Sequence, residues 1–72
     1  MEQTNLNPKK IIGGKLKRAI KNSKWRTQEG FAEAFHTSTR NVVRWCNEGI
    51  DSIELLWTIA DFLEIGVYTL LP

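Results

Sequence analysis

The sequence predicts an all-α fold, a compact bundle of about five short helices. Apolar residues recur at helical spacing in successive segments, and no stretch alternates apolar and polar residues for long enough to indicate a strand. Capping residues and turn-forming residues separate these segments. With 72 residues, the chain has the size of one small domain.

The N-terminal end divides into an arm and the start of the first helix. Residues 1–6 show no periodicity, so we expect a flexible arm over residues 1–7 and one domain over residues 8–72. Asn7 and Pro8 indicate the helix start, because asparagine is a good N-cap and proline fits the first helical position.

One apolar stripe runs along the first helix. Ile12, Leu16 and Ile20 recur every four residues, and the outward positions are mostly basic. Gly13 and Gly14 interrupt this stretch, and each weakens a helix by roughly 1 kcal/mol relative to alanine. Two alternatives follow: the helix frays at its start, or a neighbouring backbone packs closely against the glycines.

The second helix is short and begins after a capping threonine. Thr27 precedes a polar first turn, and Phe31, Ala32 and Phe35 supply an inward face that ends near Phe35. Residues 36–38 are expected to form a tight connection, because a third helix must begin at once.

The third helix is expected over about residues 38–46, with Ser38 as its N-cap. Val42 and Trp45 lie three residues apart and are expected to point inward. This spacing leaves four side chains on the outward face, namely Thr39, Arg40, Val43 and Arg44.

The C-terminal part predicts two further helices. Asp51 or Ser52 is expected to cap a fourth helix. Its apolar residues repeat at helical spacing at Leu55, Leu56, Ile59, Ala60 and Leu63. Residues 65–67 interrupt the pattern, and residues 68–71 are expected to fold back as a short fifth helix.

Three tryptophans raise the question of stacking platforms for single-stranded nucleic acid. Helical spacing instead favours core positions for Trp45 and Trp57, whereas Trp25 is expected to be partly exposed. Cys46, next to one of them, is expected to be a small buried apolar residue.

Charge is distributed unevenly along the chain. Residues 1–28 carry eight basic side chains and one acidic side chain, a net charge of +7. Residues 29–44 are neutral, and residues 45–72 carry five acidic side chains and no basic one, a net charge of −5. This asymmetry indicates a basic surface for a polyanion, although lysines that only solvate the first helix give the same pattern.

The composition argues against several classes of protein. One cysteine and one histidine cannot supply a disulfide or the usual four zinc ligands, so we expect no metal and no cofactor. No nucleophile is paired with a base, so we expect neither an enzyme nor a small-molecule substrate. No apolar run reaches the length of a membrane span and no secretory signal is evident, which predicts a cytoplasmic protein without membrane contact.

Residues 27–71, and more loosely the chain from Ile12 onward, resemble the phage-repressor and Cro (XRE) family of helix-turn-helix regulators. Thr27-Gln28 opens a helix as in that family, Phe31-Ala32 occupies the Leu-Ala positions, and Ser38 precedes the next helix. The run from Leu55 to Leu71 is similar to the family's fourth helix and closing segment.

The chain also departs from this family at three positions. His36 replaces the turn glycine, and Ile20 and Cys46 stand where the family often has an arginine and a glutamate. The resemblance implies a lambda-repressor-like fold that contains a helix-turn-helix. It further implies a transcriptional regulator that binds double-stranded DNA sequence-specifically, as a homodimer on a two-fold symmetric site.

The third helix suits the major groove of DNA, which admits one helix and exposes the base edges. The expected base contacts are Thr39, Arg40, Val43 and Arg44. The expected phosphate contacts are Thr27, Gln28, Ser38, Lys15, Arg26 and Asn47. A solvated helix face is the alternative interpretation of the two arginines, and simple helix capping is the alternative for Thr27 and Gln28.

The alternative function is a protein-interaction module of the antitoxin or adaptor type. Such a module keeps the same fold and uses an apolar surface near Trp57, Phe62 and Tyr68. The two functions are not exclusive. Salt-dependent binding to random duplex DNA distinguishes them, because contacts to phosphates release counterions.

Overall fold

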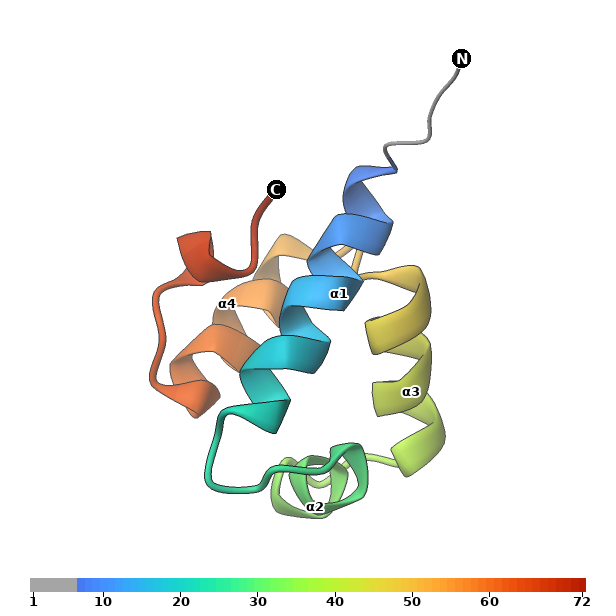
Figure 1. Ribbon diagram of the computed structural model, residues 1–72, viewed down its shortest axis with the longest axis vertical. Helices are drawn as coiled ribbons and strands as arrows, with labels where there is room; N and C mark the ends of the chain where they lie inside the picture. The colour runs from blue at the N-terminus through green and yellow to red at the C-terminus, as the bar shows by residue number, and fades with distance from the viewer. Residues whose placement is uncertain (1–6) are drawn as a thin grey trace.

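The computed structural model describes residues 7–72, so residues 1–6 of the predicted arm lie outside the described residues. This part of the chain is a compact all-helical fold without strands, which confirms the predicted class. Its elements are α1 (Pro8–Lys21), α2 (Gln28–Ala34), α3 (Thr39–Glu48), α4 (Ile53–Leu63) and the 3₁₀ turn η1 (Val67–Thr69). Figure 1 shows α3 beside α1, with α2 below them and the C-terminal segment folding back along α4.

The expected fifth helix over residues 68–71 is a single 3₁₀ turn, so the described residues contain four α-helices rather than about five. Its backbone bonds join residues three apart: Thr69 N–H donates to Gly66 O and Leu70 N–H donates to Val67 O, both at 2.9 Å. Gly66 has no side chain with which to cap a helix. The tight turn also brings Leu70, which is fully buried, back into the core.

The helix starts follow the capping residues that the sequence indicates. Each cap side chain accepts a hydrogen bond, at 2.9–3.1 Å, from a backbone N–H two or three residues further on. The caps are Asn7, Thr27, Ser38 and Ser52. These bonds satisfy donors that have no partner within the helix, and they confirm the predicted starts of α1, α2 and α3. Of the two alternatives for α4, Ser52 is the cap.

One apolar core joins all four helices and the 3₁₀ turn segment. Its fully buried side chains include Leu16 from α1, Phe31 from α2, Val42 from α3, Ile59 from α4 and Leu70 after η1. Because every element contributes side chains, the detachment of any one helix would expose part of the same core to solvent.

Gly13 allows α1 and α3 to approach closely. A methyl group at Gly13 would lie 2.6 Å from the carbonyl oxygen of Cys46 and 2.8 Å from that of Trp45, whereas nothing lies within 4 Å of the same position at Gly14. α1 begins at Pro8, ahead of both glycines. The structure therefore favours close backbone packing over fraying, and it assigns that packing to the first glycine.

The core position expected for Trp57 is wrong, because 60% of this side chain is exposed. α4 turns Leu56, Ile59 and Ala60 inward, and Trp57 follows Leu56 by one residue, a rotation of about 100° around the helix. Trp45 is half-buried and packs against the core, and Trp25 is half-buried as predicted.

Candidate nucleic-acid interface

A short connection, residues 35–38, joins α2 to α3. His36 has a left-handed backbone with φ 61°. Its N–H donates to Glu33 O at 3.2 Å, and the N–H of Thr37 donates to Ala32 O at 2.9 Å. This pair of bonds satisfies the last carbonyls of α2 and turns the chain sharply into α3. The left-handed conformation at His36 is the one that favours glycine.

Aromatic side chains hold α2 against its neighbours. Phe35 stacks on Phe31 with ring centroids 5.3 Å apart and meets the edge of Trp45 on α3 at 6.2 Å. Phe62 on α4 lies 5.1 Å from Phe35 and stacks on Trp25 at 4.9 Å. Such aromatic pairs contribute stability in addition to that gained from the apolar area they bury, and they favour particular ring orientations. These contacts therefore fix the orientation of α2 relative to α3.

α3 buries one face and exposes another. Val42 and Cys46 are buried, 0% and 5% exposed, and Trp45 is half-buried beside them. The outward face consists of the four predicted base contacts, all exposed: Thr39, Arg40, Val43 and Arg44. They form two adjacent pairs, 39–40 and 43–44, that lie one helical turn apart, so all four share one side of the helix.

A chain of hydrogen bonds runs along the exposed edge of α3. Arg44 Nη2 donates to Asn41 Oδ1 at 3.2 Å, and Asn41 Nδ2 donates to Thr37 Oγ1 at 3.1 Å. Neither Asn41 nor Thr37 is among the site residues predicted from the sequence. The separation of three residues between Asn41 and Arg44 is a signal that could have found Asn41, since side chains so spaced meet on a helix surface. Thr37 lies in the turn before the Ser38 cap, so helical spacing does not identify it.

The predicted phosphate contacts at the helix starts are engaged in capping. The hydroxyl oxygens of Thr27 and Ser38 accept backbone N–H groups at 2.9 and 3.0 Å. Each hydroxyl keeps its own proton, so it can still donate to an anion. Gln28, the first residue of α2, is half-buried.

The remaining predicted phosphate contacts lie on different sides of the molecule. Asn47 is exposed in the last turn of α3, and Arg26 is exposed beside Lys21 at the end of α1. Lys15 lines a hollow with Thr69 of η1. The structure thus places Lys15 on the side of α1 that meets the C-terminal segment.

Lys17 lies on the other side of α1, near α3. Burial raises the pKa of the Cys46 thiol to about 11, and the nearby positive charge of Lys17 partly opposes this increase. Cys46 is therefore a neutral buried thiol at physiological pH, as the sequence predicts. Lys17 follows Gly13 by four residues, so the glycine that contacts α3 and this lysine share one side of the helix.

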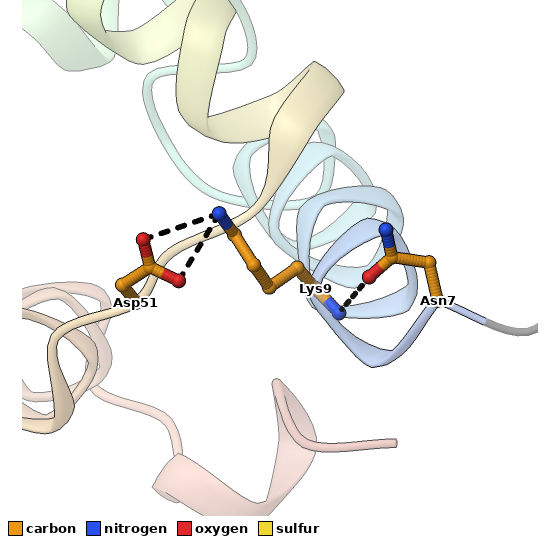
Figure 2. Close-up of polar contacts among 3 residues, drawn as sticks. All are labelled: Asn7, Lys9 and Asp51. Atoms are coloured by element: carbon orange, nitrogen blue, oxygen red, sulfur yellow. Dashed lines mark hydrogen bonds and ion pairs between the residues drawn. The ribbon is translucent and has the colours of Figure 1, made fainter.

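An exposed ion pair ties the start of α1 to the connection before α4. The ammonium of Lys9 lies 3.1 Å from both carboxylate oxygens of Asp51. The backbone N–H of Lys9 donates to the side chain of Asn7, and Figure 2 shows both contacts. Gly49, with φ 95°, lies so close to the Lys9 carbonyl that a side chain there would overlap it. Within residues 7–72, Lys9 has this carboxylate partner, whereas none of the predicted phosphate contacts forms an ion pair in that range.

Comparisons with protein-family models, with curated proteins and with solved structures found no match to this chain. Within residues 7–72, no three histidine, cysteine, aspartate or glutamate side chains gather in a way that could hold a metal ion. No helix in that range is both long enough and apolar enough to cross a membrane.

Proposed function

We propose that this chain is a non-enzymatic domain of a cytoplasmic transcriptional regulator that binds double-stranded DNA sequence-specifically. In this proposal α2, residues 35–38 and α3 form a helix-turn-helix of the lambda-repressor-like type, and α3 enters the major groove. The observation that carries the proposal is the outward face of α3. It presents two arginines, a threonine and a valine to solvent from a helix that α2 and the core hold in place.

The four exposed side chains match the chemistry of base edges. Arginine can donate two parallel hydrogen bonds to the O6 and N7 atoms of guanine, and Arg40 and Arg44 lie one helical turn apart. Val43, 39% exposed, can pack against a thymine methyl group, and Thr39 offers a hydroxyl or a methyl. Each good two-bond contact contributes about 1–3 kcal/mol of discrimination between bases.

Contacts to the DNA backbone would position α3 in the groove. The hydroxyls of Thr27 and Ser38 can donate to phosphates, and Asn47 and Arg26 are exposed near the two ends of the α2–α3 unit. Lys17 adds a positive charge on the α3 side of α1. The +7 charge of residues 1–28 supports an approach to a polyanion.

Binding of the full chain to a random-sequence duplex, measured by fluorescence anisotropy over a range of salt concentrations, tests this function. Contacts to Z phosphates give a slope of about −0.9Z in log K against log salt. We expect Lys17→Ala to weaken binding to every sequence. The slope should become less negative by about 0.9, which corresponds to the loss of one phosphate contact. Lys15→Ala is the matched control on the same helix. We expect it to weaken DNA binding less, because Lys15 lies on the side of α1 that meets the C-terminal segment. Absence of binding even at low salt would refute the proposal.

A homodimer on DNA, or binding to another protein, is favoured by a separate observation. Ile53, Trp57 and Tyr68 are 64%, 60% and 77% exposed, and large apolar side chains left in water often mark an interface. Ile53 and Trp57 lie one turn apart on α4, where Glu54 and Asp61 are also exposed. We propose a second copy of this chain as the occupant of this surface.

Salt separates this association from DNA binding. Pairing two copies through this surface brings like acidic charges together, so added salt should strengthen the dimer while it weakens DNA binding. Analytical ultracentrifugation at low and high salt measures the dimer. We expect Trp57→Glu to abolish it and to leave the fold intact, because the side chain is exposed. A wild-type chain that stays monomeric at both salt concentrations, at concentrations well above those of the DNA-binding assay, refutes the homodimer.

A further inference from the structure

We infer that Asn41 positions Arg44 to recognise a guanine in the major groove, with Thr37 holding Asn41 in place. This inference rests on the proposed function, because it names a base that the outward face of α3 selects. It assigns a role to two residues that the expected set of contacts leaves out.

The geometry constrains the Arg44 side chain at its tip. Its Nη2 donates to Asn41 Oδ1 at 3.2 Å, and Asn41 Nδ2 donates to Thr37 Oγ1 at 3.1 Å. Thr37 is itself fixed, because its N–H donates to Ala32 O at the end of α2. The connection between α2 and α3 therefore sets the direction of a guanidinium group two turns further along the chain.

The constrained guanidinium keeps the donors that guanine requires. Arginine carries five N–H donors in a planar fork, and Asn41 uses one of them. The remaining donors on Nη1 and Nη2 can still form the pair of bonds to guanine O6 and N7. Holding the fork in one direction before binding removes part of the cost of ordering a long side chain.

The same bonds reduce the ability of Asn41 to contact a base itself. A free asparagine recognises adenine through its carbonyl oxygen and its NH₂ group together. In this structure the oxygen accepts from Arg44, and one of the two N–H groups donates to Thr37. The geometry therefore assigns base contact to Arg44 and positioning to Asn41, and it favours a G·C pair over an A·T pair at that place.

Arg40 provides an internal control on the same face. It is exposed one turn before Arg44, and no side-chain hydrogen bond of Arg40 is formed within residues 7–72. Substitution of Asn41 should therefore change the preference at the base pair under Arg44 and leave the pair under Arg40 unaffected.

The test begins with selection of duplexes bound by the full chain from a random-sequence pool. Selection repeated with Arg44→Ala identifies the base pair that depends on Arg44, which we expect to contain guanine. Affinities are then measured for two duplexes that differ only in G·C or A·T at this position. The proteins compared are the wild type, Arg44→Ala, Asn41→Ala, Thr37→Val and the Asn41→Ala/Arg44→Ala double variant, with circular dichroism to verify folding.

We expect Arg44→Ala to reduce the preference for G·C by about 5- to 150-fold. Asn41→Ala should reduce it by about 2- to 12-fold, since Arg44 must then be ordered on binding. Thr37→Val should change it in the same direction by a smaller factor. In the Arg44→Ala background, Asn41→Ala should have no further effect on the preference.

Three results would overturn the inference while leaving DNA binding intact. They are an equal loss of affinity for both duplexes on Asn41→Ala, an effect of Asn41→Ala that persists without Arg44, or selection of adenine at the Arg44 position. If the wild type binds no duplex at low salt, the proposed function fails first and the inference fails with it.

Discussion

Replacing each of two neighbouring glycines by alanine tests the close contact between α1 and α3. Gly13 and Gly14 occupy the same helix, and both substitutions raise helix propensity by the same amount, about 1 kcal/mol. Their surroundings differ. A methyl group at Gly13 would lie 2.6 Å and 2.8 Å from two backbone carbonyl oxygens of α3, whereas nothing lies within 4 Å at Gly14.

The two substitutions should therefore differ in their effect on the free energy of unfolding. Gly14→Ala should stabilise the domain by about 1 kcal/mol, which raises the Tm of a domain of this size by about 4–8 °C. At Gly13 the obstructing atoms belong to the α3 backbone and cannot rotate away as a side chain can. Overpacking of this kind costs about 1–3 kcal/mol, so Gly13→Ala should range from neutral to destabilising by about 2 kcal/mol.

Urea denaturation followed by circular dichroism measures both free energies under the same conditions. The difference between the variants isolates the contact, because the propensity gain is common to both. If Gly13→Ala stabilised the domain as much as Gly14→Ala, α1 and α3 would not pack as closely as described, and the reasoning would be refuted.

Three further outcomes are expected. His36→Gly should raise the free energy of unfolding by about 1 kcal/mol, because φ 61° strains a residue with a Cβ; an unchanged or lower Tm would contradict this. The raised pKa of Cys46 means that the unfolded thiol loses its proton from about pH 9.0, whereas the folded thiol keeps it up to about pH 11. Stability should therefore be complete below pH 9 and fall as the pH rises through this window, and a pH series should show a smaller fall for Cys46→Ala. A double-mutant cycle on Lys9 and Asp51 should give a coupling below about 1 kcal/mol, since 45% and 79% of these side chains are exposed; a larger value would show that the ion pair is not solvent-screened.

Features governed by local chemistry could be predicted from the sequence. The N-caps Asn7, Thr27 and Ser38 were identified because a capping side chain bonds to a backbone N–H only two or three residues away. The all-α class followed from periodicity, which the sequence itself contains. The left-handed conformation at His36 is likewise where the comparison with a turn glycine predicts strain.

Features that depend on distant segments could not be predicted in the same way. Whether Gly13 or Gly14 meets another backbone depends on the position of α3, which the spacing of α1 does not contain. Trp57 lies next to inward-facing Leu56 and is as apolar as a core residue, but the packing of α4 turns Leu56, Ile59 and Ala60 inward and leaves Trp57 exposed. The expected fifth helix failed because Leu70 must reach the core within a few residues of Gly66, which a 3₁₀ turn achieves.

If α3 binds DNA as proposed, its exposed face alone is an incomplete description of base preference. Periodicity identified Arg44 as outward, and an outward arginine without restraint could contact a phosphate or any guanine within reach. The bond from Arg44 to Asn41 and the bond from Asn41 to Thr37 limit that reach. Thr37 belongs to the turn and not to α3, so the turn that connects the two helices also determines the direction of the arginine. Changes in the turn sequence should therefore alter base preference even when every outward residue of α3 stays the same.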